Sequence, residues 1–329
     1  MCAIYGFVNY KHLLSGSQLK ELVRNLSIAS EVRGTDASGI AYVKNGYLSV
    51  YKTPKPSHEV DFFFPSDTTI LTGHTRWTTQ GSAKNNCNNH PFVGNTADGS
   101  FALCHNGILR NDKELAVQYH LPKTEIKTDT YVAVQLLERH SSLCFETIAE
   151  MCETVRGDFV FTILNDDNTL YLAKGNNPIC LIHSKRLGLY IYSSTSEIMT
   201  ESLKGTFLEG ETFELIHLNG GDIISIDKHG NVKNYIFDFV DDFPFGYSMV
   251  GHRGFSWYDE DDEDDDDDYL TEIYQMYGID PDDLLMLRDV GYDDEDIEMM
   301  CYDPEYLQYC LNEARGFLGY YDDSQSGAG

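Results

Sequence analysis

Hydrophobic and polar residues follow strand-like and helix-like periods along the first 238 residues of the chain. Residues 2–9 form an apolar run with the length of a buried strand. Apolar positions then recur at helical spacing from Leu19 to Ala29, with Ser17 as the expected N-cap and Gly34 as the expected end. The chain is therefore predicted to begin with a strand followed by a helix.

Short strand-like runs, separated by Gly, Asn and Pro clusters, fill most of the remaining sequence up to residue 238. Two helical stretches interrupt them, at residues 128–139 and 144–155. Strands are predicted at residues 40–43, 48–51, 69–74, 101–105, 159–164, 170–174, 179–183, 189–193, 212–217, 222–227 and 232–237. Many strands in two groups, with helices between the groups, predict two packed sheets covered by helices.

Composition narrows the class of protein. With 329 residues, 42% of them hydrophobic, the chain can bury one large core and a small satellite module. No apolar run approaches the roughly 18 residues that cross a bilayer, and no basic stretch precedes an apolar one at the N-terminus. Eight cysteines without CxxC spacing indicate reduced thiols. We expect a cytoplasmic protein with no membrane partner, no metal and no cofactor.

Charge is distributed unevenly along the chain. Residues 241–329 contain 27 acidic and 3 basic residues, whereas the preceding 240 residues contain 26 and 21. Such a tail repels phosphate backbones, so no nucleic-acid partner is expected. Ten consecutive acids at residues 259–268 predict a solvated, extended segment within a linker at residues 239–268.

A small helical module is predicted at residues 269–318, followed by a disordered tail at residues 319–329. Two segments each place Asp before Pro, then acidic and apolar residues, then Gly, which is the signature of a capped helix. The predicted caps are Asp280 and Asp303, the first helical residues Pro281 and Pro304, and the ends Gly291 and Gly316.

Cys2 stands directly behind the initiator methionine. If Met1 is removed, Cys2 carries a thiol and a free α-amine together. The thiolate is the nucleophilic form, and an amine that titrates near about 8 can take the thiol proton without a separate histidine. Cys2 is therefore a candidate nucleophile, although a cysteine follows methionine by chance in many proteins.

Two charged residues form a candidate binding site for an amino acid. Arg76 ends a predicted strand in GHTRWTTQG, where a guanidinium can hold a carboxylate through two hydrogen bonds. Asp129 lies in the predicted first turn of a helix in KTDTYVAVQLLE. Together they would recognise both ends of a zwitterion. The alternatives are a structural arginine paired with an acid, and a helix-capping carboxylate.

Asn106 and Gly107 directly follow a predicted strand in CHNGIL. A side-chain amide and a backbone N–H at this position can point at one oxygen, as the donors of an oxyanion hole do. The alternative is an ordinary Asn-Gly turn.

These motifs together resemble the glutaminase domain of class II glutamine amidotransferases over residues 2 to about 237. The similarity is greatest to the glutaminase half of glucosamine-6-phosphate synthase. Six segments occur in the family's order and at about its distances: MCAIYGF, RGTDASGI, GHTRWTTQG, NNHPF, CHNGIL and TDT. SSTSEIM and LEGETFELIHLNGGDIISI are similar to the closing segments of that half.

The resemblance implies a fold, a reaction and a set of roles. The fold would be α+β, a four-layer αββα sandwich of the N-terminal-nucleophile hydrolase type. Cys2 would attack the side-chain amide of glutamine, forming a γ-glutamyl thioester and releasing ammonia. Asn106 and Gly107 would hold the oxyanion, Arg76 the substrate carboxylate and Asp129 its ammonium. The residues expected to line or brace the pocket are Trp77, Thr79, Arg33, Asp36 and His90.

Two positions depart from the family pattern. Ala3 stands where the family usually has Gly, and Gln80 stands where the sugar-synthase members have His. Both departures concern the subfamily rather than the glutaminase chemistry, because Cys2, Arg76 and Asp129 are retained.

Three functional hypotheses remain open from the sequence. In the first, glutamine is hydrolysed and ammonia passes to an acceptor protein on a separate chain, docked through the acidic C-terminal region. In the second, the substrate is another γ-glutamyl compound. In the third, the domain is a catalytically silent binding module that carries the acidic tail.

Overall fold

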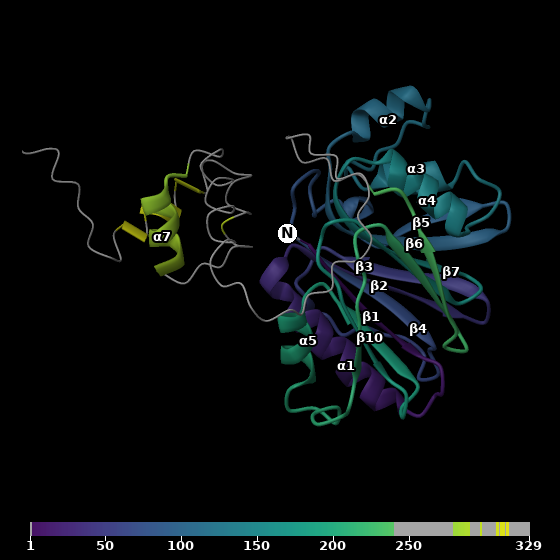
Figure 1. Cartoon of the computed structure of the whole chain (residues 1–329). Helices are drawn as coiled ribbons and strands as arrows, with labels where there is room; N and C mark the ends of the chain where they lie inside the picture. Colours follow the sequence, from purple (N-terminus) through teal and green to yellow (C-terminus); the bar gives the residue numbers. More distant parts are fainter. Residues whose placement is uncertain are drawn as a thin grey trace, which may run out of the picture. The chain divides into compact units, whose positions relative to one another are not determined.

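The computed structural model describes residues 2–239, 279–289, 297, 307–308, 310–312 and 314–315 (Figure 1). The chain divides into two compact units, Met1–Ser248 and Met249–Gly329. Both β-sheets belong to the first unit. Of the predicted linker at residues 239–268 only residue 239 is described. The predicted tail at residues 319–329 lies outside the described residues, as do Gly291, Asp303, Pro304 and Gly316.

The first sheet has seven antiparallel strands in the order β11-β9-β10-β1-β4-β2-β3. Its strands are β1 (Ala3–Asn9), β2 (Ala37–Lys44), β3 (Tyr47–Thr53), β4 (Ile70–Arg76), β9 (Cys180–Ser184), β10 (Leu189–Ser193) and β11 (Glu214–Ile216). β1 lies in the middle of this sheet, and every residue of the strand is buried, as its mostly apolar sequence predicts.

The second sheet has six antiparallel strands in the order β13-β12-β8-β7-β6-β5. Its strands are β5 (Phe92–Thr96), β6 (Gly99–Leu109), β7 (Gly157–Asn165), β8 (Thr169–Lys174), β12 (Asp222–Asp227) and β13 (Val232–Ile236). β6 is longer than its outer neighbour, because the register with β5 covers only Gly99 to Leu103. The second half of β6 therefore has an edge that no other described strand covers.

Helices cover the outer face of each sheet (Figure 1). α1 (Gly16–Ala29), a 3₁₀ turn η1 (Ser30–Arg33) and α5 (Ser196–Leu203) belong to the first sheet's side. α2 (Asp112–Gln118), α3 (Tyr131–Leu137) and α4 (Phe145–Thr154) belong to the second sheet's side. Short 3₁₀ turns η2 (Ser57–Glu59) and η3 (Asn86–Asn88) lie in the loops.

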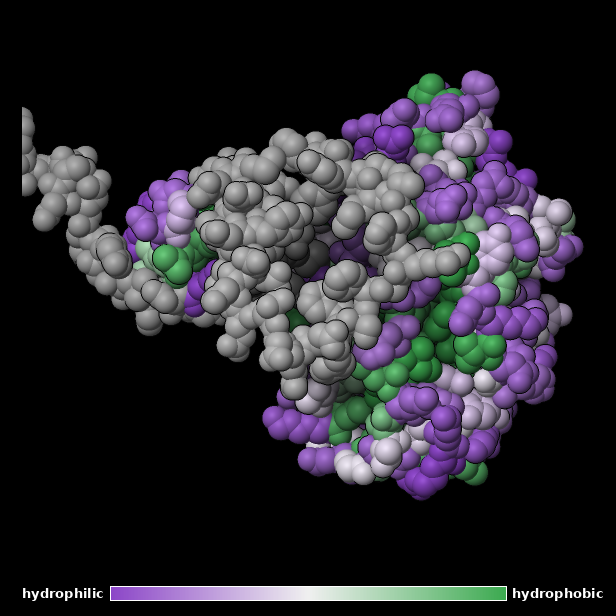
Figure 2. All heavy atoms as spheres, in the orientation of Figure 1, coloured by the Kyte–Doolittle hydropathy of each residue, from purple (hydrophilic) through white to green (hydrophobic). Residues whose placement is uncertain are grey.

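Three apolar clusters correspond to the three interfaces of this sandwich. One joins α3 and α4 to the second sheet, and one joins α1 and α5 to the first sheet. The third lies between the sheets and includes Ile4, Val8, Cys104 and Val160. The visible surface of residues 2–239 is mostly hydrophilic, with apolar residues gathered in a narrower band (Figure 2). The predicted αββα sandwich is thus confirmed.

Several predicted boundaries were wrong. The N-cap of α1 is Ser15, whose hydroxyl accepts from the Gln18 amide while the Gln18 side chain accepts from the Ser15 amide. This capping box gives Ser15 two interactions that Ser17 lacks. The predicted helix at residues 128–139 is shorter, from Tyr131 to Leu137. β5, α2 and α5 were not predicted.

In the second unit, α7 (Pro281–Asp289) begins as the sequence predicts. Oδ1 of Asp280 accepts hydrogen bonds from the amides of Asp282 and Asp283, at 2.9 and 3.1 Å. Asp283 also forms a 2.7 Å ion pair with Arg315. Among the described residues, no helix is long and apolar enough to span a membrane.

Candidate active site

Cys2 lies immediately before β1, beside the end of β4. The register pairs Ala3 with Thr75, which brings Cys2 next to Arg76 on the neighbouring strand. The Cys2 thiol contacts the carbonyl oxygen of Trp77 at 3.5 Å, and Nε of Arg33 donates to the Cys2 carbonyl at 3.0 Å. Both ends of the residue are therefore held by its neighbours.

The electrostatic surroundings of Cys2 act in opposite directions. Burial raises the pKa of the thiol, and the negative charge of Asp129 raises it further, whereas the positive charge of Arg76 lowers it. Removal of the thiol from water disfavours the charged thiolate. Activation of Cys2 therefore depends on a nearby base or cation.

Arg76 is the last residue of β4 and is almost completely buried. Nη1 donates to Oδ1 of Asn89 at 2.8 Å, and Nη2 donates to the carbonyls of Gln80 and Gly81 at 2.5 and 3.2 Å. Within residues 2–239 no carboxylate forms an ion pair with it. The guanidinium is thus fixed by neutral acceptors, and its role in binding a carboxylate stays a prediction.

Asn106 and Gly107 lie inside β6, so the prediction that they follow a strand was wrong. Asn106 is fully buried, and neither Oδ1 nor Nδ2 of its side chain has a hydrogen-bond partner among the described residues. Leaving such a group unpaired costs about 1–3 kcal/mol. An unpaired buried amide is typical of a site that completes its hydrogen bonds with a ligand.

Gly107 is required by its backbone. Its φ of +145° belongs to the region that favours glycine, and a Cβ built there would lie 1.7 Å from the carbonyl oxygen of Asp158. No other residue fits without a shift of β6 against β7. The sequence pattern HNG therefore marks a bent strand rather than a turn.

The uncovered edge of β6 carries successive polar contacts. Nε2 of His74 donates to the His105 carbonyl at 3.0 Å, and the Leu109 amide donates to Oδ2 of Asp129 at 2.7 Å. Because alternate residues of a strand direct their peptide groups to the same edge, Gly107 lies between these two contacts. The His74 bond also ties β4 to β6, so the Arg76 and Asn106 segments are held together.

Asp129 precedes α3 instead of lying in its first turn, because the N-cap position is Thr130. The Asp129 side chain is buried, and one carboxylate oxygen accepts the Leu109 amide described above. That bond explains how a carboxylate is tolerated in the interior. The second carboxylate oxygen, Oδ1, takes no part in this bond.

The loop after Arg76 is held by Asp36. The Asp36 amide donates to the Arg76 carbonyl at 2.9 Å, and its carboxylate accepts from the Thr78 amide at 2.8 Å. The side chains of Trp77 and Thr79 are exposed, Trp77 by 54%. Asp36 therefore braces this loop, while pocket-lining roles for Trp77 and Thr79 stay predictions.

His90 is buried and stacks on His74, with ring centroids 4.0 Å apart. Burial lowers the pKa of His74 to about 3 and holds the pKa of His90 well below its usual range. Both rings are therefore neutral at physiological pH. His90 also packs edge-on against Phe92, with ring centroids 4.4 Å apart, while its role as a brace of the pocket wall stays a prediction.

Sequence reasoning missed the amides that organise the loop at residues 77–90. Asn89 holds Arg76 and also donates to the Ala83 carbonyl at 2.8 Å. Asn88 accepts from the Lys127 amide at 2.8 Å and donates to the Ser82 carbonyl at 3.1 Å, which joins this loop to the Asp129 segment. The asparagine-rich stretch at residues 85–89 was the available signal.

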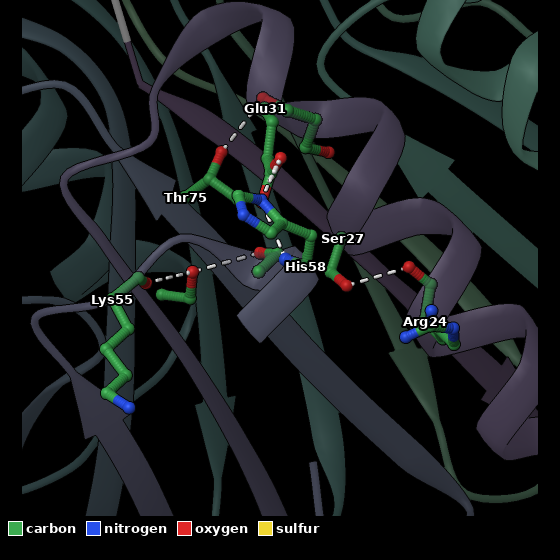
Figure 3. Close-up of polar contacts among 9 residues, drawn as sticks. Arg24, Ser27, Glu31, Lys55, His58 and Thr75 are labelled. Atoms are coloured by element: carbon green, nitrogen blue, oxygen red, sulfur yellow. Dashed lines mark hydrogen bonds and ion pairs between the residues drawn. The ribbon is translucent and has the colours of Figure 1, made fainter. Parts of the chain in front are cut away.

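A second polar network fixes the turn that carries Arg33. Thr75 donates to the Ser30 carbonyl at 3.1 Å, and the Glu31 carboxylate accepts from the His58 amide at 2.7 Å (Figure 3). η1 is thus attached to β4 on one side and to η2 on the other. Among the described residues, no group of three or more His, Cys, Asp or Glu side chains could hold a metal ion.

A family model described as a glutamine amidotransferase domain matches residues 74–201, which contain Arg76, Asn106, Gly107 and Asp129. Glutamine–fructose-6-phosphate aminotransferase (isomerizing) of Staphylococcus aureus is 30% identical over 245 residues. The domain at residues 2–239 belongs to the class II glutamine amidotransferase family. The Staphylococcus aureus match covers 70% of this chain and 38% of the relative.

The Staphylococcus epidermidis protein of the same name is 31% identical over 188 residues, covering 54% of this chain and 30% of the relative. The chain therefore spans about two fifths of the length of the first of these curated relatives.

Two solved structures resemble this chain in fold. One is the glutamine phosphoribosylpyrophosphate amidotransferase of B. subtilis complexed with ADP and GMP, with a TM-score of 0.56 and 19% identity. The other is described as the allosteric regulatory enzyme of purine biosynthesis, with a TM-score of 0.57 and 18% identity. Each match covers 73% of this chain and 50% of the other chain. The chain thus shares the fold of these two proteins over about three quarters of its length.

Proposed function

We propose that the domain hydrolyses the side-chain amide of glutamine through a Cys2 γ-glutamyl thioester, releasing glutamate and ammonia. The observation that carries this proposal is the fully buried Asn106 side chain, whose amide has no partner among the described residues. Family membership supports the choice of an amide substrate. The negative oxygen of a tetrahedral intermediate is the partner that such a donor stabilises best.

The α-carboxylate and α-ammonium of the substrate would be held by two charged side chains from different parts of the fold. Arg76 would bind the α-carboxylate, since it is buried, oriented by Asn89 and without an ion pair within residues 2–239. Asp129 would bind the α-ammonium through the oxygen that the Leu109 amide leaves free. Both charges are close enough to Cys2 to change the pKa of its thiol. A buried guanidinium and a buried carboxylate beside the nucleophile favour a zwitterionic substrate.

The reaction would proceed in two balanced halves. The Cys2 thiolate forms a bond to the amide carbon, and the electron pair of the C=O π bond moves to oxygen, beside Asn106 and the Gly107 amide. When this oxyanion collapses, the C–N bond breaks and the nitrogen takes the proton that the Cys2 α-amine accepted from the thiol. Water then adds to the thioester, the C–S bond breaks, and glutamate leaves. This scheme requires removal of Met1.

The direct test is glutamate and ammonia release from glutamine by the purified chain, with its N-terminus verified by intact mass. Cys2→Ala should abolish release while the thermal unfolding transition is retained. A protein that begins at Cys2 and releases no glutamate would contradict the proposal. Comparison of glutamine with a γ-glutamyl peptide separates the two amide substrates.

We further propose that ammonia passes to an acceptor enzyme on a separate chain, docked through the acidic residues 241–329. The excess of 24 negative charges there favours a basic partner surface, and a tether would raise the effective concentration of the two sites. Deletion of residues 259–329 should leave glutamine hydrolysis intact but uncouple it from the acceptor reaction. Equal coupling with and without the tail would contradict docking.

A further inference from the structure

Asn177 lies in the loop that leads from β8 to β9 and thus from one sheet to the other. Its Nδ2 donates a 3.0 Å hydrogen bond to the main-chain carbonyl of Asn106, 71 residues away in sequence. Asn177 is half-buried, and neither the motifs nor the fold accounts for this contact.

The loop that carries Asn177 is attached to β7 at several points. The Gly175 amide donates to the Phe159 carbonyl at 2.9 Å, and Oδ1 of Asn176 accepts from the Phe159 amide at 3.2 Å. Nδ2 of Asn176 donates to the Asp158 carboxylate at 2.5 Å, and Nζ of Lys174 donates to the Asn177 carbonyl at 3.1 Å. The loop is therefore held in place by these hydrogen bonds, and Asn177 contacts β6 from it.

The carbonyl of Asn106 and the N–H of Gly107 belong to one planar peptide unit and point in opposite directions. A donor that fixes the carbonyl consequently fixes the direction of the N–H. It also polarises the peptide, since hydrogen bonds in series strengthen one another in a poorly polar interior. The bond from Asn177 to the Asn106 carbonyl thus acts on the Gly107 N–H through the peptide unit that they share.

This support has a specific structural reason. Gly107 has no side chain to restrain it and sits at a φ of +145°. β5 ends its pairing at Leu103, so no strand of the described residues pairs with the far edge of β6 at this level. The peptide that must aim at the substrate is thus held from one side, where Asn106 pairs with Val160 of β7.

We propose that Asn177 is a positioning residue that aims and polarises the Asn106–Gly107 peptide for oxyanion stabilisation. This inference rests on the proposed glutamine hydrolysis. Among the described residues Asn177 bonds to Asn106 and Lys174 and not to Cys2, so its loss should affect the transition state more than the binding of glutamine. The effect should be smaller than the 10²–10³-fold loss caused by removing an oxyanion donor outright, and we expect about 10-fold.

The kinetic test compares Asn177→Ala and the isosteric Asn177→Asp with wild type, all beginning at Cys2. We expect kcat for glutamine to fall about 10-fold in Asn177→Ala, with KM changed less than about 2-fold. In Asn177→Asp the fall in kcat should be larger, because a carboxylate oxygen would then face the Asn106 carbonyl oxygen. Asn177→Gln, which retains the amide donor, should recover part of the loss. Asn111→Ala is the matched control, because Nδ2 of Asn111 donates to the Thr154 carbonyl at an equal 3.0 Å.

Two inhibitors separate positioning from general damage. The Cys2 sulfur adds to the aldehyde carbon of glutamate γ-semialdehyde, and the aldehyde oxygen takes up the thiol proton. The resulting hemithioacetal mimics the tetrahedral intermediate. Its affinity should fall by the same factor as kcat/KM. Alkylation of Cys2 by iodoacetamide displaces iodide and forms no oxyanion, so its rate should stay unchanged. A fall in alkylation equal to the fall in kcat would overturn the proposal.

An NMR measurement tests the hydrogen bond without any activity. With ¹³C-carbonyl asparagine and ¹⁵N-glycine labels, only three Asn–Gly peptides give a signal, ending at Gly46, Gly107 and Gly220. Asn177→Ala should shift the Gly107 signal and leave the Gly46 signal in place. An unmoved Gly107 signal would overturn the proposal. A shifted signal in a chain that releases no glutamate would instead confirm the contact and refute the hydrolase function.

Discussion

Oδ1 of Asn89 accepts a 2.8 Å hydrogen bond from Nη1 of Arg76, and both side chains are almost completely buried. The contact joins the end of β4 to the loop that precedes β5. It orients a cation with a neutral partner, so the positive charge is retained. A carboxylate at this position would instead form an ion pair with the guanidinium, as the alternative of a structural arginine paired with an acid supposed.

Asn89→Ala should therefore weaken the recognition of the substrate carboxylate. We expect KM for glutamine to rise about 10-fold with kcat changed less than about 3-fold, since a hydrogen bond to a charged group contributes about 1.5–3 kcal/mol. The value of kcat/KM for 4-aminobutanamide, which is glutamine without its carboxylate, should stay unchanged. Asn111→Ala is again the buried control. A parallel loss for both substrates would show that Asn89 supports the fold instead.

Gly107→Ala should remove oxyanion stabilisation. The added Cβ meets the Asp158 carbonyl at 1.7 Å, so the peptide must move and its N–H must turn away. We expect kcat for glutamine to fall about 10²–10³-fold, measured with Cys2 alkylation as a check on the fold.

Gly46→Ala is the matched control for this prediction. Gly46 also has a positive φ, of +77°, but nothing lies within 4 Å of an added Cβ. The strain of about 1–2 kcal/mol should lower stability and leave kcat unchanged. Equal activity of Gly107→Ala and Gly46→Ala would contradict the oxyanion role.

The architecture could be read from the sequence because burial leaves a strong pattern. β1 is buried at every position and α1 keeps its apolar spacing, so both appear in the sequence as expected. β5 was missed because its burial alternates around glycine and asparagine, residues that disfavour strands. The ends of β6 were missed because the sequence gives no sign that a strand continues past its neighbour.

The candidate site was predicted where a residue's own chemistry marks it, as for Cys2 and Arg76. Asn89 and Asn177 could not be predicted, since an asparagine in a polar loop looks like a turn former. Their importance arises only from long-range contacts, to Arg76 and to the Asn106 carbonyl. Asp129 was predicted to bind an ammonium, but its bond to the Leu109 amide depends on the pairing of distant segments.

The two charges near Cys2 should shift its alkylation profile in opposite directions. Arg76 lowers the pKa of the thiol and Asp129 raises it. Arg76→Gln should therefore move the midpoint of iodoacetamide alkylation to higher pH, and Asp129→Asn should move it to lower pH. Rates measured between pH 6 and 10 need no substrate, so lost glutamine binding does not interfere. Shifts of the same sign would contradict this electrostatic arrangement.

The buried histidines should make the domain sensitive to acid. The pKa of His74 is about 3 in the folded chain against an ordinary 6.5, and the pKa values of His90 and His105 are also lowered. Below pH 6.5 the unfolded chain binds protons that the folded chain excludes. The free energy of unfolding should then fall with pH by up to about 1.4 kcal/mol per unit for each histidine.

His90→Phe should reduce this dependence, as measured by urea unfolding at pH 7, 6 and 5. Both ring nitrogens of His90 lack a partner among the described residues, so phenylalanine loses no hydrogen bond there. It can also retain the packing between His74 and Phe92. The exposed His229, replaced by Gln, is the control and should leave the slope as in wild type. An unchanged slope in His90→Phe would mean that His90 takes up its proton without unfolding, and that the buried pair is open to water.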